Sequence, residues 1–173
     1  MLIYSFHPCI KSPAPRSFAG LMELYEANYM QVMRLCAGLD NIPHSAVSSI
    51  DGALDLHLYL LERCKYTTTI SLTYYFQDHN GELKPDPNLK VRIYHDACQA
   101  EVLSRSFRRL GIQVNTQDVS SKSELISRWS LNRFLYKWLG YCRYQGHSFP
   151  EETVYFEQSR SFTRDTGMLT DLS

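Results

Sequence analysis

The side chains best suited to chemistry lie close together between residues 92 and 101. They are an arginine, a tyrosine, a histidine and two acids, at Arg92, Tyr94, His95, Asp96 and Glu101. Arginine can bind an anion and histidine can move a proton, so the cluster could bind a ligand or do acid–base work. In a competing structural interpretation, His95 and Asp96 cap a hairpin loop and Arg92 forms a cross-strand ion pair with Glu101. Because charge clusters are often structural, we favour the second interpretation and keep the first open.

A metal site at this cluster is not expected. Neighbouring side chains of a regular strand point to opposite faces, so His95 and Asp96 could share an ion with Glu101 only in a turn geometry. The sequence also lacks a glycine-rich loop that could cradle phosphates, which counts against nucleoside-triphosphate hydrolysis of familiar kinds. We predict neither a metal nor another cofactor.

A second polar group has the spacing of one strand face. Asp55, His57 and Tyr59 follow one another at two-residue steps, and an Asp–His pair resembles part of a nucleophilic arrangement. No serine in a Gly-x-Ser-x-Gly context and no cysteine motif accompanies the pair. We therefore favour a solvated or helix-covered sheet face.

The densest basic cluster consists of Arg105, Arg108 and Arg109 around Phe107. Basic residues beside an aromatic ring can hold phosphates or a single strand of nucleic acid. The chain as a whole is neutral, with 18 basic and 18 acidic residues, so it has no general attraction to nucleic acid or to an anionic membrane. A solvated loop is the favoured interpretation, and we do not expect nucleic-acid binding.

The first element that must position these groups is an amphipathic helix. Ser17 is a suitable N-cap, and Gly38 stands where a C′ glycine belongs. Between them the apolar residues recur at three- and four-residue steps and form one stripe. The stripe consists of Phe18, Leu21, Met22, Tyr25, Tyr29, Val32, Met33 and Cys36.

A second amphipathic helix is predicted from about Glu124 to Gln145, ending at Gly146. Its core stripe consists of Leu131, Leu135, Trp138 and Cys142, widened by Phe134, Leu139 and Tyr141. The polar residues 108–123 before it are predicted to be a connection, and residues 77–88, with Asn80-Gly81 and two prolines, a loop.

Strands are predicted between the helices. Val47 and Ser49 lead into Asp51-Gly52, a signal for a two-residue hairpin turn. Leucines then alternate with other residues from Leu54 to Leu61, and Tyr66 to Phe76 forms the next strand. A three-residue loop, 64–66, would place Leu60 opposite Ile70 and Leu58 opposite Leu72, so that the apolar groups share one face.

The alternation changes phase within residues 89–107. Val91 and Ile93 are odd, whereas Ala100 and Val102 are even, so one unbroken strand would place the two pairs on opposite faces. A hairpin with a four-residue loop, 95–98, removes this conflict. It would pair Ile93 with Ala100, Val91 with Val102, and Arg92 with Glu101 on the other face.

Length and composition indicate one domain in a reducing compartment. The chain has 173 residues and five widely spaced cysteines without a Cys-x-x-Cys motif, which indicates reduced thiols and cytoplasmic localisation. No apolar run approaches the roughly 18–20 residues of a membrane helix. We predict an irregular N-terminal arm over residues 1–16, one domain over 17–146, and a mobile C-terminal tail over 147–173.

Several segments together resemble the YqiB-like family of gammaproteobacterial proteins, a family defined by a domain of unknown function. They are Leu24-Tyr25-Glu26-Ala27-Asn28-Tyr29 with Arg34-Leu35, Arg63 with Tyr66-Thr67-Thr68, residues 91–97 with Ala100-Glu101-Val102, and Asn132-Arg133-Phe134-Leu135 with Trp138-Leu139 and Cys142. The resemblance spans about residues 18–146 and implies a bacterial cytoplasmic protein. It carries no catalytic residues over, and we add Arg63 and Tyr66 to the candidate binding residues.

The predicted fold class is α+β, with an antiparallel sheet of about five strands packed by the N-terminal and C-terminal helices on its apolar face. No catalytic arrangement is recognisable, so we expect a non-enzymatic interaction or regulatory module that holds a protein partner. The alternative is a binder of a small anionic ligand, or an enzyme, that uses the Arg92, Tyr94, His95 and Glu101 cluster. A concave pocket lined by those side chains would favour the alternative.

Overall fold

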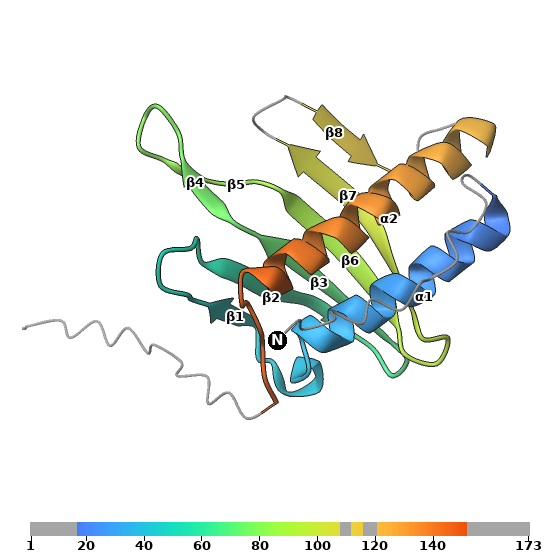
Figure 1. The fold of residues 1–173 in the computed structure, drawn as a ribbon, viewed down its shortest axis with the longest axis horizontal. Coiled ribbons are helices and arrows are strands. Elements are labelled where there is room, and N and C mark those ends of the chain that lie inside the picture. The colour runs from blue at the N-terminus through green and yellow to red at the C-terminus, as the bar shows by residue number, and fades with distance from the viewer. Residues whose placement is uncertain (1–16, 108–111, 116–120, 152–173) are drawn as a thin grey trace, which may run out of the picture.

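Two helices cover one face of an antiparallel sheet in the computed structural model (Figure 1). The structure describes residues 17–107, 112–115 and 121–151, so the predicted arm and residues 152–173 of the predicted tail lie outside the described residues. The six-stranded sheet has the order β1-β2-β3-β6-β7-β8, and β4 and β5 form a separate two-stranded sheet. The predicted α+β class is confirmed, with one strand more in the main sheet than the five expected.

The elements follow the chain in this order: α1 (Phe18–Leu35), the 3₁₀ helix η1 (Leu39–Asn41), β1 (Ser45–Ser48), β2 (Leu56–Arg63), β3 (Thr67–Thr73), β4 (Tyr75–Gln77), β5 (Leu83–Pro85), β6 (Asn88–Tyr94), β7 (Gln99–Phe107), β8 (Ile112–Asn115) and α2 (Ser121–Tyr144). β8 and the first turn of α2 lie within residues 108–123, which were predicted to be a connection. β4 and β5 pair within the predicted loop of residues 77–88.

α1 begins as the sequence predicts and ends differently. Ser17 is its N-cap, and the Ser17 Oγ accepts a hydrogen bond from the Gly20 backbone N–H at 3.0 Å. The predicted stripe supplies Leu21, Tyr25, Val32 and Cys36 to the core, whereas Phe18 is 68% exposed. The helix ends at Leu35, and Gly38 has a φ of −86°, so Gly38 is not a left-handed C′ residue.

Gly38 serves instead as the contact point of the segment after α2. A Cβ at Gly38 would lie 2.4 Å from the Pro150 carbonyl oxygen, so a larger residue would not fit. The Gly38 N–H donates to the Phe149 carbonyl at 3.0 Å, and the Phe149 N–H donates to the Leu35 carbonyl at 2.7 Å. His147 and Phe149 are buried. The folded unit therefore extends beyond Gly146, which corrects the predicted start of the tail.

The strand registers follow the apolar pattern. Leu60 pairs with Ile70 and Leu58 with Leu72, as predicted. The connection is one residue longer than expected because Arg63 pairs with Thr68, and a bulge between Leu60 and Glu62 restores the register. The predicted two-residue hairpin at Asp51-Gly52 is wrong, since pairing of β1 with β2 begins only at Ser48 and Leu56. Asp51 and Gly52 form the centre of a turn inside that longer loop.

The hairpin of β6 and β7 matches its prediction. Ile93 pairs with Ala100, Val91 with Val102, Arg92 with Glu101, and Tyr94 with Gln99, which leaves a four-residue loop. The apolar partners of these pairs are buried in the core beneath α1 and α2. Within the described residues, no helix has the length and apolar character that crossing a membrane requires.

Candidate functional site

A pocket of about 510 Å³ lies at the edge of β7, and we call it the β7-edge pocket. Its walls are the N-terminal halves of α1 and α2 and the hairpin that joins β6 to β7. The residues that line it are Phe18, Leu21, Met22, Tyr25, Tyr94, Ala97, Gln99, Glu101, Glu124, Leu125 and Arg128. A pocket of this volume can hold a small ligand or a few side chains of a partner.

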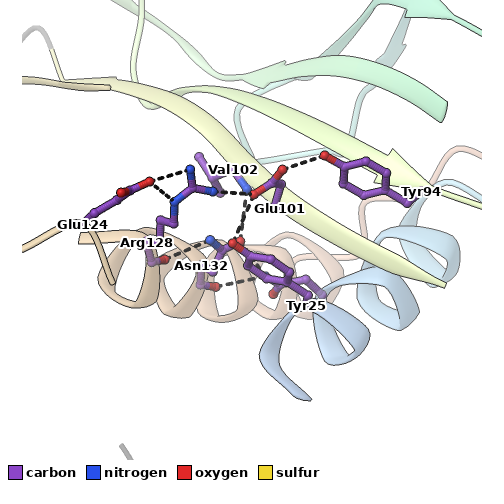
Figure 2. Close-up of polar contacts among 8 residues, drawn as sticks. Tyr25, Tyr94, Glu101, Val102, Glu124, Arg128 and Asn132 are labelled. Carbon is purple, nitrogen blue, oxygen red and sulfur yellow. Dashed lines mark hydrogen bonds and ion pairs between the residues drawn. The ribbon is translucent and has the colours of Figure 1, made fainter. Parts of the chain in front are cut away.

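Glu101 is the centre of the polar wall of this pocket. Its side chain is only 12% exposed, and three donors from three elements bind its carboxylate (Figure 2). The Tyr94 hydroxyl donates to Oε1 at 2.7 Å. The Tyr25 hydroxyl on α1 donates to Oε2 at 3.1 Å, and Arg128 Nη1 on α2 donates to the same oxygen at 3.3 Å. A buried carboxylate requires such partners, so this arrangement also fixes both helices to β7.

Arg128 is shared between two carboxylates. Its Nη2 lies 2.8 Å from Glu124 Oε1, one turn earlier on α2, and its Nε donates to the same oxygen at 3.0 Å. Glu101 is its second partner. Two carboxylates and one guanidinium leave the polar wall with a formal charge of −1. Such a wall favours cations and hydrogen-bond donors over anions.

Two buried asparagines hold the helices together beside this wall. Asn28 of α1 donates from Nδ2 to the backbone oxygen and to Oδ1 of Asn132 on α2, both at 3.2 Å. Asn132 Oδ1 also accepts the Val102 backbone N–H at 3.0 Å. The side chain of Asn132 thereby gives the Val102 backbone N–H of β7 a hydrogen-bond partner outside the sheet.

Burial and the carboxylate keep both tyrosine hydroxyls protonated. Burial and the charge of Glu101 raise the pKa of Tyr25 to about 12. Burial and the hydrogen bond with Glu101 raise the pKa of Tyr94. Burial opposes the charge on Arg128, but its hydrogen bonds with Tyr25 and Glu124 raise its pKa. At neutral pH both hydroxyls are therefore donors, with little tendency to exchange protons.

The structure brings together two of the four residues of the ligand-binding alternative, Tyr94 and Glu101, whereas Arg92 and His95 do not line the β7-edge pocket. Arg92 and Glu101 are direct partners in the ladder, as predicted, but the expected ion pair between them does not form. Arg92 Nη2 lies 3.6 Å from Glu62, and its Nε donates weakly to Thr69 at 3.4 Å. The bulge in β2 places Glu62 opposite Thr69 and so beside Arg92.

The other predicted residues have structural partners elsewhere. Arg63 Nη2 donates to the backbone oxygens of Leu39 at 2.8 Å and Ile42 at 3.0 Å, which ties β2 to η1. Tyr66 is 53% exposed, and the Lys65 ammonium lies 4.9 Å from its ring centroid.

The loop residues of the β6–β7 hairpin serve the turn itself. His95 Nε2 lies 2.8 Å from Thr68 Oγ1, which joins the end of β6 to β3. Asp96 Oδ1 accepts the Ala97 backbone N–H at 2.9 Å on the protein surface. Both contacts agree with the structural interpretation of this loop. Within the described residues, no group of three or more histidine, cysteine or acidic side chains could hold a metal ion.

The polar face around His57 is lined by aromatic rings. His57 stacks with Tyr59 at 6.3 Å between ring centroids and meets the Tyr75 ring edge-on at 4.8 Å. Burial lowers the pKa of His57, and the charge of Asp55 opposes this shift. In the basic cluster, the Arg105 guanidinium lies 3.4 Å from the Phe134 ring centroid. Arg108 and Arg109 lie outside the described residues.

The helical half of the pocket is not predicted from the sequence. The sequence places Tyr25 in the apolar stripe of α1 and gives no functional role to Arg128 or Glu124. The four-residue spacing of Glu124 and Arg128 is a recognisable helical ion pair, and Asn28 and Asn132 are polar residues within apolar helix faces. These two signals could have pointed to a buried polar interface between the helices.

The architecture defines the class of this protein as a small α+β domain, in which two helices side by side cover an antiparallel sheet. The helices enclose a polar network beside the part of β7 that β8 does not pair with. Residues 31–148 match the family described as "Protein of unknown function (DUF1249)". The chain belongs to this family, and the predicted YqiB-like resemblance is confirmed.

Two kinds of relative illustrate the similarity. Uncharacterized protein YqiB of Escherichia coli K12 is 29% identical over 138 residues, which cover 75% of this chain and 90% of that protein. Pseudomonine synthase PmsE of Pseudomonas entomophila is 30% identical over 131 residues, which cover 75% of this chain but only 20% of that protein. No solved structure shows significant similarity to the chain.

Proposed function

We propose that this protein is a non-enzymatic interaction module, and that its β7-edge pocket binds an apolar, positively charged segment of a protein partner. The observation that carries the proposal is the closed polar network on one wall of the pocket. Tyr25, Tyr94 and Arg128 all bind Glu101, and Arg128 also binds Glu124, so the network is suited to present a fixed surface rather than to exchange protons.

Charge and apolar surface define the expected partner. The network has a formal charge of −1, and Phe18 at the pocket mouth is 68% exposed although it is a large apolar ring. Leu21, Met22 and Leu125 extend the apolar lining. An apolar segment with a lysine or arginine would cover the rings and place its charge beside Glu101 and Glu124.

The comparison with the longer relative supports a module. A unit similar to this chain makes up 20% of pseudomonine synthase PmsE, so units of this kind occur within a longer chain. Domains that act by binding are often reused in this way, whereas fold similarity alone defines no chemistry.

The test is quantitative affinity capture with two matched variants, Phe18→Ala and Tyr144→Ala. Both positions are exposed, at 68% and 88%, and Tyr144 does not line the pocket. We expect Phe18→Ala to lower recovery of the partner at least fivefold, because an exposed aromatic anchor is lost, and Tyr144→Ala to leave it unchanged. Equal recovery with both variants would refute the role of the pocket.

A further inference from the structure

A second cavity shares no lining residue with the β7-edge pocket, and aromatic side chains form much of its wall. It measures about 390 Å³ and lies between the C-terminal end of α2, the β4–β5 region and the loop after β1. Four aromatic side chains line it, from Tyr74, Phe76, Trp138 and Tyr141, together with one carboxylate and one histidine, Asp86 and His147. We call it the aromatic pocket.

Aromatic rings make up much of the wall of this cavity. The Tyr74 hydroxyl donates to Cys142 Sγ at 3.4 Å and is thus directed into the core. The Tyr74 and Trp138 rings meet edge to face at 5.6 Å between centroids. Tyr141 is 52% exposed. Ring faces carry partial negative charge, and several faces around one cavity are a recurrent way to bind an organic cation.

His147 supplies a buried polar atom without a partner. The residue is 3% exposed, and its ring lines the cavity. Its Nδ1 lies 3.2 Å from Ser48 Oγ, whereas its Nε2 has no hydrogen-bond partner among the described residues. Buried polar atoms are nearly always satisfied, so this nitrogen needs a donor. The atom is closed to solvent in this structure, and a ligand donor reaches it only when the ring or a neighbouring group shifts.

The protonation of His147 defines what that group must be. Burial is the largest influence and lowers the pKa of His147, so the ring is neutral at pH 7. The contact with Ser48 and the charge of Asp55 oppose this shift. We assign the ring proton to Nδ1, which then donates to Ser48 Oγ; Nε2 is then an acceptor, and its partner must be a donor.

Asp86 adds a negative charge to the wall. Its carboxylate is half-buried, and no ion pair within 4.0 Å engages it in the part of the chain that the structure describes. At longer range Asp86 favours the charged form of Arg105, although burial is the larger influence and lowers the pKa of Arg105 to about 10. A carboxylate, a nitrogen acceptor and ring faces all favour the same kind of ligand.

We propose that the aromatic pocket binds an organic ammonium ion, with an ammonium N–H donating to His147 Nε2, its charge facing Asp86, and its apolar body against Tyr74 and Trp138. The site is separate from the proposed partner-binding pocket and does not depend on it. The ligand chemistry is shared by free amines and by lysine side chains of peptides.

The test is an NMR titration of the protein at pH 7, with phenethylammonium as the probe and phenethyl alcohol as its neutral counterpart. The chain has two tryptophans, Trp129 and Trp138, so the indole N–H signal of Trp129 is an internal control. We expect the ammonium to shift the Trp138 signal in a saturable way, and the alcohol to bind at least tenfold more weakly. Equal binding of the two compounds, or shifts away from Trp138, would overturn the proposal.

Variants separate this site from the first one. Asp86→Asn keeps the shape of a half-buried side chain and should weaken phenethylammonium binding about tenfold or more, while Phe18→Ala should leave it unchanged. Unchanged binding in Asp86→Asn would contradict the assigned role of the carboxylate. Nα-acetyllysine amide is then compared with phenethylammonium, and tighter binding of the peptide-like probe identifies lysine side chains rather than free amines as the source.

Discussion

Replacing Arg128 by methionine tests whether the polar network around Glu101 contributes to the free energy of unfolding as a buried ion pair or only as an exposed one. Methionine keeps much of the apolar stem and removes the guanidinium. The matched control is Arg92→Met, which makes the same change on the outer face of the sheet. Arg92 and Glu62 are 37% and 55% exposed and 3.6 Å apart, so this pair should contribute at most about 1 kcal/mol to the free energy of unfolding.

Arg128 should contribute more because of its partner. The Glu101 side chain is 12% exposed, and losing one partner of a fully buried pair costs about 3–5 kcal/mol. The Arg128 side chain is itself 31% exposed, and two tyrosine hydroxyls would remain on the carboxylate, so that cost must be reduced. We therefore expect Arg128→Met to lower the free energy of unfolding by about 2 kcal/mol.

Urea denaturation followed by circular dichroism measures both costs at pH 7. The two variants should keep the wild-type dependence on urea concentration, which reports the surface exposed on unfolding, and differ in midpoint. Adding Glu101→Gln to Arg128→Met removes the stranded charge and should recover about 1 kcal/mol. Equal costs for Arg92→Met and Arg128→Met, or no recovery in the double variant, would refute the description of Glu101 as a buried charge held by its partners.

Three further predictions concern the rest of the fold. Gly38→Ala should lower the free energy of unfolding by about 1–3 kcal/mol, because its Cβ would overlap the Pro150 carbonyl. Gly140→Ala, in open space on α2, should raise the free energy of unfolding by about 0.5–1 kcal/mol. Thermal melts that rank the two variants in the opposite order would contradict this. Truncation after Gly146 removes the buried Phe149 ring and should lower the free energy of unfolding by about 3–5 kcal/mol in urea denaturation. Truncation after Glu151 keeps this ring and should lower it by less than about 2 kcal/mol. Similar losses in both would mean that the segment 147–151 does not stabilise the domain. The raised pKa of Tyr25 stabilises the fold below pH 10, and this contribution should disappear between about pH 10 and about pH 12. Tyr25→Phe should therefore reduce the dependence of the free energy of unfolding on pH in this range. An unchanged dependence in the variant would show that Tyr25 ionises normally in the folded protein.

The registers of the central strands could be predicted because a shift of one residue would exchange the two faces of the sheet. Leu58 opposite Leu72, and Ile93 opposite Ala100, are the pairings that keep all large apolar groups on the face covered by the helices. The helix start at Ser17 was equally accessible, because capping depends on a few adjacent residues.

The candidate site could be predicted only in part, because its halves meet through tertiary packing. Glu101 and Tyr94 share a face of one hairpin, so their proximity follows from local register. Tyr25 and Arg128 reach Glu101 from helices that are distant in sequence, and no period in the chain encodes that meeting. The bulge in β2 similarly gave Arg92 a partner that alternation alone would not identify.

The docked segment after α2 was missed for a related reason. Phe149 is a single apolar residue among polar neighbours, so it creates no periodic pattern. Its burial depends on a close approach to Gly38, which the sequence suggested only as a helix terminator. A glycine after a helix can therefore indicate close contact with another segment as well as a left-handed cap.

Site-specific photo-cross-linking tests the proposed interaction module most directly. A photoreactive amino acid is placed at Met22, which lines the β7-edge pocket, or at Tyr144, which is 88% exposed and does not line it, and the protein is irradiated in the native host. We expect one dominant protein adduct at position 22, absent at position 144, whose cross-linked segment is apolar and contains lysine or arginine. The same adducts at both positions, or an acidic cross-linked segment at position 22, would contradict it.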